Sequence, residues 1–383
     1  MTPDTDFGFA EHAPLFLPPP ATDEGERLAR LRLIRSRRVG PATYLRLMGE
    51  HGAARAALQA LPDVARAAGV EGYAACPEPV ALAELKAAKR AGARMLCLGD
   101  PDYPKVLAGI ADAPPVLWAR GRVDLMDRPM LALVGTRNAS ALGTRMARVL
   151  AADLGAAGFV IVSGLARGID ALAHRAALET GTIAVMAGGL DVVYPAENTD
   201  LARDIAAQGL GLSEMPFGLE PQARHFPRRN RIVAGLTQAV IVVEAAVRSG
   251  SLITARMALD QGREVMAVPG HPMDSRASGT NLLIRDGAVL VRGAEDVIEA
   301  VGAQTACSPV RASAPPARPT TEQPPQEGGV EGAILAILGP SPVAEDQLIR
   351  DLGRPPRAVA QALAILEMAG RITRSAGGFV ARL

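Results

Sequence analysis

The sequence contains few aromatic residues, cysteines and histidines, and each shortage argues against a class of function. Phe, Trp and Tyr make up 3% of the 383 residues, which argues against a surface that binds single strands mainly by stacking bases on exposed rings. Cys76, Cys97 and Cys307 lie far apart and form no C-x-x-C pair, so we predict neither a disulfide framework nor a zinc knuckle. The five histidines show no ligand spacing such as H-E-x-x-H, and we expect no metal or cofactor.

Long apolar runs and an excess of charge are also missing. No run approaches the length that spans a membrane, and the first residues are acidic and proline-rich where a signal peptide is basic and then apolar. The net charge is +1, so a nucleic-acid partner can be argued only from where the arginines gather. With 49% hydrophobic residues, the chain can bury a large core in two or three domains. We expect a cytoplasmic protein with no membrane partner.

Periodicity and composition divide the chain into five parts. The predicted parts are a disordered tail (1–22), a helical domain like a SAM or helix-hairpin-helix module (23–85), an extended Rossmann-like domain (86–301), a linker (302–330) and a winged-helix domain (331–383). The last is predicted from three helical segments followed by a small hairpin. Its third helix is not strongly basic, so protein contact or a structural role stays as open as DNA reading.

The helical domain contains a basic block. Eight arginines and one acid, Glu50, lie between Arg27 and Arg55. The turn Val39-Gly40-Pro41 joins two helical stretches, and a glycine turn that opens a helix is how helix-hairpin-helix modules present amides to phosphate. An arginine-rich helical bundle with an ordinary turn explains the same pattern, so both interpretations stay open.

From Pro129 onward, apolar runs alternate with helical patterns. Continuous apolar strands separated by crossover helices are typical of a parallel sheet covered on both faces. We predict strands at 130–134, 159–162, 183–187, 209–213, 239–244 and 264–268. The predicted fold class is α/β, with a Rossmann-like, doubly wound and mainly parallel sheet. Residues 86–128 predict an extra strand-helix-strand layer that leads into the main domain.

Polar loops follow several of these strands, and ligands of open parallel sheets bind at that edge, near the point where strand order reverses. The loop after the second strand offers glycines for close approach, a hydroxyl, a cation and free helix amides. Together the loops predict a cradle for a polyanion, because a single mononucleotide would not need so many groups. The candidates are Arg137 and Ser140 after the first strand, Ser163, Gly164, Arg167 and Gly168 after the second, Arg229, Asn230 and Arg231 before the run 232–234, and Ser249, Gly250 and Ser251 after the strand ending at Glu244.

Motifs for nucleotide enzymes are missing from these loops. None is a G-x-G-x-x-G with a downstream acid, and none is G-x-x-x-x-G-K-[ST], so NAD binding and ATP hydrolysis are poorly supported. Asp170 and His174 lie four residues apart and could pair behind a nucleophilic Ser163, but such a pair more often orders its helix. Three acids near strand ends could bind a ribose or a metal, or could pair with the arginines and shape the loops: Asp191, Glu214 and Glu244. We predict no catalytic residue.

In their order along the chain, the motifs resemble those of the DNA-processing protein A family, also called DprA or Smf. The resemblance covers roughly residues 86–300, and the N-terminal helices and winged helix resemble that family's accessory domains more weakly. It rests on Val134 to Arg137, Ser163 to Asp170 with Ala173-His174, Gly189 to Asn198, Phe226 to Arg231, Glu244-Ala245 with Ser249 to Ser251, and Gly279 to Asn281.

The resemblance implies a cytoplasmic bacterial protein that binds and protects incoming single-stranded DNA and has no catalytic activity. It also implies a homodimer formed through the Rossmann-like domain, and loading of the RecA recombinase during natural transformation. No short motif marks the RecA or dimer surfaces, and the DNA contacts carry over onto Arg137, Ser163, Gly164, Arg167, the cluster Arg229 to Arg231 and Ser249-Gly250. The alternative is a Rossmann-like enzyme acting on a nucleotide or ribose phosphate, which would want a Glu beside Gly279-Thr280-Asn281 as acid or base; none is there.

Overall fold

The structure is a computed structural model that describes residues 17–302, 330–338, 343–375 and 379–382. Most of the predicted tail and nearly all of the predicted linker therefore lie outside the described residues. The chain divides into two compact units, residues 1–305 and 306–383, and each is considered by itself.

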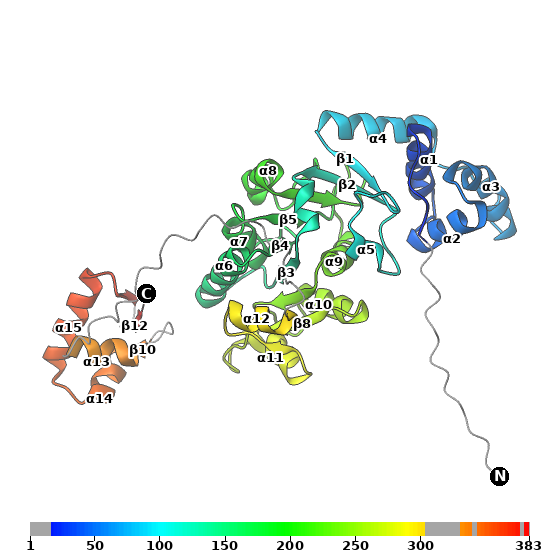
Figure 1. Cartoon of the computed structure of the whole chain (residues 1–383). Coiled ribbons are helices and arrows are strands. Elements are labelled where there is room, and N and C mark those ends of the chain that lie inside the picture. The colour runs from blue at the N-terminus through cyan, green and yellow to red at the C-terminus, as the bar shows by residue number, and fades with distance from the viewer. Residues whose placement is uncertain (1–16, 303–329, 339–342, 376–378, 383) are drawn as a thin grey trace, which may run out of the picture. The chain divides into compact units, whose positions relative to one another are not determined.

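The larger unit is built on a nine-stranded sheet with the order β1-β2-β6-β5-β4-β3-β7-β8-β9 (Figure 1). All pairs from β6 to β9 are parallel, whereas β1 and β2 join antiparallel at one edge. This confirms the doubly wound, mainly parallel sheet. The strands are β1 (Arg94–Cys97), β2 (Val116–Gly121), β3 (Met130–Val134), β4 (Val160–Ser163), β5 (Thr182–Val185), β6 (Leu210–Ser213), β7 (Ala239–Val242), β8 (Glu264–Ala267) and β9 (Val289–Leu290).

The predicted strand-helix-strand unit of residues 86–128 is present as β1, α5 and β2, but it does not form an extra layer. Strand β2 pairs with β6, so β1 and β2 extend the main sheet. Strand order reverses at β3, because β4 to β6 follow on one side and β7 to β9 on the other. Loops after β3 and its neighbours therefore meet at one edge, where such folds bind ligands.

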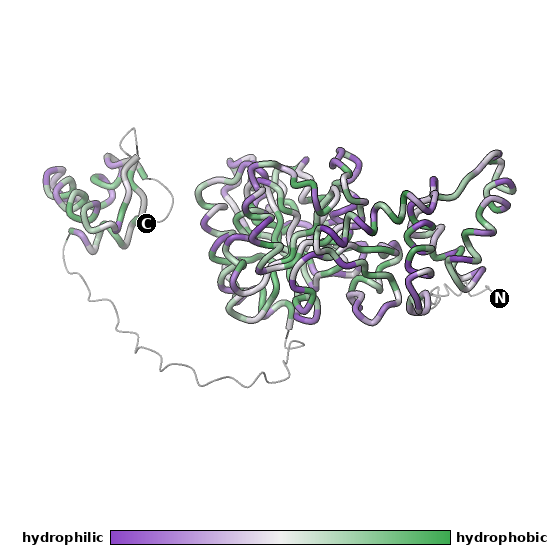
Figure 2. The backbone as a smooth tube through the Cα atoms, turned by 90° about the horizontal axis from the view of Figure 1, so that it is seen from above, coloured by the Kyte–Doolittle hydropathy of each residue, from purple (hydrophilic) through white to green (hydrophobic). Residues whose placement is uncertain are grey.

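Helices cover both faces of the sheet, as continuous apolar strands require. In β3, Leu131 and Leu133 pack under the helices of one face, and Met130, Ala132 and Val134 under those of the other. Figure 2 shows hydrophobic segments concentrated within the sheet region. One face carries α6 (Ala141–Ala156), α7 (Ile169–Ala176), α8 (Thr199–Gln208) and α12 (Ala294–Val301), and the other carries α5 (Lys105–Ala108), α9 (His225–Leu236) and α10 (Gly250–Asp260); α11 (Ser278–Arg285) packs beside β8.

The N-terminal helices have a core of their own and also pack on the sheet edge. Leu31 of α1 lies in one apolar cluster with Met95 of β1 and Trp118 of β2, and Arg27 pairs with Asp100 at 2.7 Å. Residues 17–302 thus form one compact unit, and a domain boundary at residue 85 stays a prediction. These helices are α1 (Glu24–Arg35), α2 (Pro41–His51), α3 (Ala54–Ala67) and α4 (Glu78–Arg90).

The smaller unit has the predicted three helices and hairpin around one apolar core. A short strand, β10, precedes the second helix and pairs with the hairpin in the order β10-β12-β11; it was not predicted, since two residues carry too little pattern. The elements are α13 (Val330–Ile337), β10 (Val343–Ala344), α14 (Glu345–Leu352), α15 (Pro356–Met368), β11 (Ile372–Ser375) and β12 (Phe379–Arg382).

The described residues contain neither a membrane-spanning helix nor a cluster of metal ligands. No helix there has both the length and the apolar character that crossing a membrane requires. No group of three or more His, Cys, Asp and Glu side chains in those ranges is placed to hold a metal ion.

Candidate nucleic-acid interface

Four segments that follow different strands meet at the switch-point edge of the sheet. The guanidinium carbon of Arg137, after β3, lies 5.3 Å from the ring centre of Phe226 in α9. The Phe226 ring lies 5.8 Å from that of Tyr194, after β5. Gly164, in the loop 164–168 after β4, approaches the side chain of Arg229 and lines one small hollow together with Tyr194 and Phe226. Cation, rings and glycine loop therefore form one surface.

Gly164 is a glycine because the Arg229 guanidinium occupies the place of a side chain. A Cβ atom built on Gly164 would overlap both terminal nitrogens of Arg229. Arg229 is 6% exposed, lies 3.9 Å from Asp170, and its side chain donates no hydrogen bond within the described part of the chain. A buried guanidinium whose donors are unused is an anion receptor with free capacity.

Burial disfavours charge on both members of this pair. It lowers the pKa of Arg229 despite the attraction of Asp170. It raises the pKa of Asp170, although Arg229 and the amides of Ala166 and Gly164 act in the opposite direction. A phosphate beside Arg229 would add a second counter-charge, which favours the charged guanidinium.

The loop 164–168 is held from below by two buried side chains of α7. Asp170 accepts hydrogen bonds from the amides of Gly164 (3.1 Å) and Ala166 (3.4 Å). The Nε2 atom of His174 accepts from the amide of Leu165 at 3.3 Å, and its Nδ1 lies 2.7 Å from the Thr182 hydroxyl. Burial lowers the pKa of His174 to about 3, so the neutral ring fits these contacts. Asp170 and His174 thus order the loop.

A nucleophile is not assembled here. The Ser163 hydroxyl is fully buried and donates to the Leu133 carbonyl at 2.6 Å, while His174 contacts Leu165 and Thr182 instead. The alternative in which Asp170 and His174 pair behind a nucleophilic Ser163 is therefore wrong, because Ser163 and His174 have other hydrogen-bond partners. Ser163 secures the end of β4 to β3.

The N-terminus of α6 already holds a carboxylate. The amide of Ser140 donates to Glu244 at 2.9 Å, and its hydroxyl donates to the same group. Ser140 also caps α6 by accepting from Gly143 at 2.9 Å. A phosphate could reach Ser140 only by displacing Glu244, so of the two roles open for Glu244, shaping the loop is the one observed.

The expectation that the run 228–231 supplies guanidiniums close together is not met by Arg229 and Arg231, which have different partners. They lie within α9, where successive side chains point in different directions. Arg231 is buried and donates to Glu214 and to the Asp112 carbonyl, whereas Arg229 faces Gly164. Asn230 is also buried, with its amide 3.5 Å from the Gly250 carbonyl. A phosphate contact by Arg231 stays a prediction, and its guanidinium is already committed.

The remaining candidates border the same edge. Ser249 caps α10, accepting from Ser251 at 3.3 Å, and Gly250 is exposed with open space around it. Gly168 has φ of +71° at the start of α7, a conformation that favours glycine. Arg167 pairs with Glu197 at 2.9 Å, with both side chains more than half exposed, so the pair costs little to break.

The aromatic pair was missed by sequence reasoning. The low aromatic content argued against stacking, but Tyr194 and Phe226 are drawn from distant segments to one place and Tyr194 is 52% exposed. Both lie inside the quoted motifs, which was the available signal. The apolar hollow beneath them, lined by Gly164 and Pro221 among others, has a volume of about 10 Å³, so a base would lie on the rings rather than enter it.

Sequence profiles of one family match three parts of the chain. The profile described as DNA recombination-mediator protein A matches residues 94–302. Those described as DprA-like N-terminal HHH domain and DprA winged helix domain match residues 24–87 and 315–378. The third match begins at residue 315, within the predicted linker, and the predicted domain boundaries stay predictions.

Curated relatives and solved structures agree with these profiles. Protein Smf of Synechocystis sp. is 37% identical over 307 residues, covering 73% of this chain and 77% of the relative. DNA processing protein DprA of Streptococcus pneumoniae is 47% identical over 201 residues, covering 52% and 71%.

Two solved structures are similar as well. The X-ray structure of DNA processing protein A from Streptococcus pneumoniae has a TM-score of 0.61 at 35% identity, covering 72% of this chain and 97% of that one. That of Helicobacter pylori DNA processing protein A, whose title describes its single-stranded DNA binding mode, has a TM-score of 0.51 at 32% identity, covering 55% and 95%. With sequence profiles, relatives and fold in agreement, the chain belongs to the DNA recombination-mediator protein A family, also called DprA or Smf.

Proposed function

We propose that this protein binds single-stranded DNA without catalysis and acts as a recombination mediator. The observation that carries the proposal is the surface formed by Arg137, Phe226 and Tyr194 beside the Gly164 loop and Arg229. Sites for single strands combine cations that contact the phosphate backbone with aromatic rings on which bases stack. The single-stranded DNA binding of the Helicobacter pylori relative supports the same reading.

Phosphate contacts come from two kinds of residue in this proposal. Arg137 and Arg167 are exposed and supply mobile cations, and Gly250 leaves the start of α10 open to close approach. Arg229 supplies a fixed cation behind Gly164. Ser140, Ser163, Gly168, Asn230, Arg231, Ser249 and Ser251 serve mainly by holding these groups in place, because their polar atoms are engaged, buried or at a constrained turn.

Base contacts are proposed for Tyr194 and Phe226. Stacking on a ring tolerates any base, so we expect little sequence preference. Because Arg137 already lies over Phe226, a base that stacks there would bring its phosphate close to the guanidinium. The two kinds of contact would then act on neighbouring atoms of one nucleotide.

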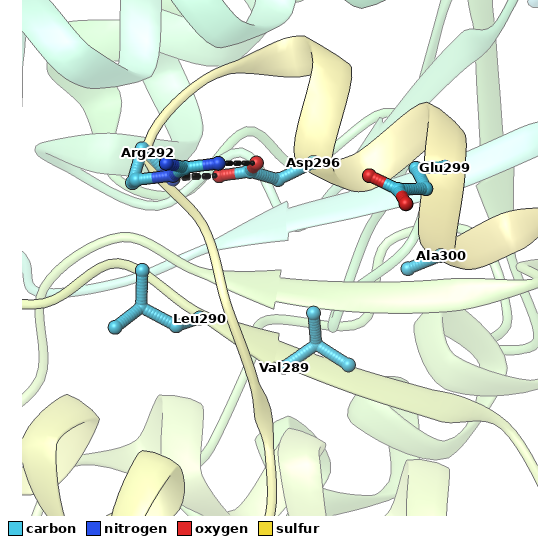
Figure 3. A pocket seen from close by; sticks show the side chains of 6 residues that line it. All are labelled: Val289, Leu290, Arg292, Asp296, Glu299 and Ala300. Atoms are coloured by element: carbon cyan, nitrogen blue, oxygen red, sulfur yellow. Dashed lines mark hydrogen bonds and ion pairs between the residues drawn. The ribbon is translucent and has the colours of Figure 1, made fainter.

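The open edge of the sheet at β9 is the proposed dimer surface (Figure 3). Within the described residues β9 pairs only with β8, so its outer backbone groups are available to another strand. Leu290 is 41% exposed and Ile298 of the adjacent α12 is 40% exposed. In Figure 3, the Arg292–Asp296 ion pair, 2.7 Å long, borders the two apolar side chains of β9.

Dimer formation is tested by Leu290→Glu, because a buried carboxylate at a two-fold axis would meet its own copy. We expect the wild-type chain to elute as a dimer and the variant as a monomer with unchanged helical content. An exposed apolar residue away from this edge, Leu259, which is 59% exposed, provides the matched control Leu259→Glu. A dimeric Leu290→Glu variant would place the interface elsewhere.

Loading of RecA, a cytoplasmic location and a role in natural transformation complete the proposal, and all three rest on family membership. The decisive functional experiment is recombinase loading: RecA filament growth on DNA coated with single-strand binding protein should accelerate when this protein is added. A protein that binds DNA yet leaves filament growth unchanged would retain the first half of the proposal and lose the second.

Salt dependence tests the binding mode directly. If about three phosphates are neutralised, log affinity should fall against log salt with a slope of about −2, from roughly 0.7 per phosphate on single strands. Gel-shift titrations of single- and double-stranded oligonucleotides at several salt concentrations measure both slope and preference. A salt-insensitive affinity would contradict the phosphate contacts.

A further inference from the structure

The N-terminal helices contact the start of loop 214–224, which connects β6 to α9. Arg35, the last residue of α1, donates to the backbone carbonyl of Glu214 at 3.1 Å. The same guanidinium donates to both carboxylate oxygens of Glu84 in α4, at 2.7 and 3.0 Å. Both side chains are largely buried, so these charge-assisted bonds are shielded from solvent and fixed in geometry.

Trp118 belongs to the same contact. Its indole N–H donates to Glu84 at 2.8 Å, and its ring meets that of Phe217 edge-on at 5.4 Å. Trp118 is buried in β2 and is the single tryptophan of the chain. Its fluorescence therefore reports on this one place, where the N-terminal helices, the sheet edge and the loop 214–224 meet.

The far side of the same loop forms part of the DNA-facing surface. The Glu214 carboxylate pairs with Arg231 in α9, two residues beyond Arg229. Pro221 lines the narrow hollow together with Gly164 and Phe226. A shift of this loop would therefore move the first turn of α9, which carries the Phe226 ring.

We propose that Arg35 and Glu84 are positioning residues for DNA binding, through which the N-terminal helices set the affinity for single strands without touching the strand. They hold the loop 214–224, and the loop holds Phe226 and Arg229 against Gly164. The expected effect on DNA affinity rests on the proposed function. The holding of loop 214–224 by Arg35 and Glu84 rests only on the hydrogen bonds described above.

The first experiment needs no DNA. In Arg35→Ala, amide hydrogen exchange of residues 214–224 should accelerate, and Trp118 emission should move to longer wavelength as water reaches the indole. The matched control is Arg46→Ala, which removes an equally long side chain whose pair with Glu50 is exposed; neither signal should change. Unchanged hydrogen exchange in a folded Arg35→Ala protein would show that the contact of Arg35 and Glu84 with loop 214–224, here called the clamp, does not hold the loop.

The second experiment measures coupling between the clamp and the DNA-facing residues. Arg35→Ala should weaken single-strand binding by about three- to tenfold, as expected for coupled neighbours, with an unchanged salt slope. In a double-mutant cycle, Arg35→Ala should lower the single-strand affinity much less when Phe226 has already been replaced by Ala. Arg248→Ala removes an exposed cation beside Gly250, on the separate loop between β7 and α10, so any loss of affinity that it causes should be additive with that of Arg35→Ala.

A general loss of stability predicts a different pattern. It would lower the melting temperature and affect both cycles alike, so additivity with Phe226→Ala would refute the positioning role. Glu84→Gln provides a gentler variant, since it keeps one acceptor for Trp118 and removes only the charge. If the wild-type chain binds no single strands, the proposed function fails, while the exchange and fluorescence experiment still decides the clamp.

Discussion

Replacing Gly164 by alanine tests the arrangement at the interface with a single methyl group. The backbone of Gly164 is not in the left-handed region, so the substitution itself adds no backbone strain. The new Cβ, however, would overlap the Arg229 guanidinium, which must leave its place beside Asp170. We expect the loop to keep its shape and Arg229 to lose contact with the strand.

The magnitude follows from the one contact that is lost. A hydrogen bond to a charged group contributes about 1.5–3 kcal/mol, which corresponds to a tenfold to hundredfold loss of affinity. Fluorescence anisotropy with a labelled oligonucleotide measures this loss. Gly109→Ala is the matched control, because its φ is −79° and the nearest atom, the Val106 carbonyl oxygen, is at an ordinary 3.5 Å; its affinity should be unchanged.

A double variant decides whether the steric reasoning is right. When Arg229 is already Ala, the space beside Gly164 is empty, and Gly164→Ala should then cost little further affinity. Equal losses in both backgrounds would mean that the methyl group blocks the strand itself rather than displacing the guanidinium. An undiminished affinity of Gly164→Ala would refute the role of Arg229.

Three further predictions follow from the same surface. Phe226→Ala should weaken binding by about 1–3 kcal/mol, the cost of one lost base stack, and leave the salt slope unchanged, whereas Arg137→Ala should reduce the slope by about 0.7; salt titrations distinguish them. The third concerns His174, whose folded pKa of about 3 lies below the ordinary 6.5, so its contribution to stability is complete above pH 6.5 and is lost as the pH falls towards 3. Urea unfolding should show wild type losing about 1.6 kcal/mol more than His174→Gln between pH 6.5 and 5, since the slope rises from half of 1.36 kcal/mol per pH unit at pH 6.5 to nearly the full value at pH 5; parallel curves would contradict this.

Local pattern was sufficient for most of the fold. The strands at 130–134, 210–213 and 264–267 lie within one residue of their predicted bounds, because a buried parallel strand is a continuous apolar run that needs no partner to be recognised. Strand β9 escaped prediction, since its two residues are too short to show a period. The attachment of β2 to β6 escaped as well, because pairing between distant segments leaves no local signal.

The candidate site was predicted as a set of loops but not as a set of contacts. Glycines and arginines at strand ends pointed to the edge where the loops after β3, β4 and β5 come together. Which polar groups are free to bind a ligand depends on acids in other segments. Asp112 and Glu214 pair with Arg231, and Glu244 accepts a hydrogen bond from the amide of Ser140, 104 positions away. The aromatic pair was likewise invisible, since composition reports how many rings exist and not where they meet.

The amino-acid sequence by itself determined the Rossmann-like sheet and the helical and winged-helix parts, and it predicted an anion-binding edge whose loops lack the motifs of nucleotide enzymes. These follow from apolar periodicity and turn chemistry, which act over a few residues. Only the tertiary structure decided that Arg229 is a buried cation beside Gly164, that Phe226 adjoins both Tyr194 and Arg137, and that Arg35 contacts the loop leading to them. Each depends on packing between segments separated along the chain, and burial sets which charges remain available to a ligand.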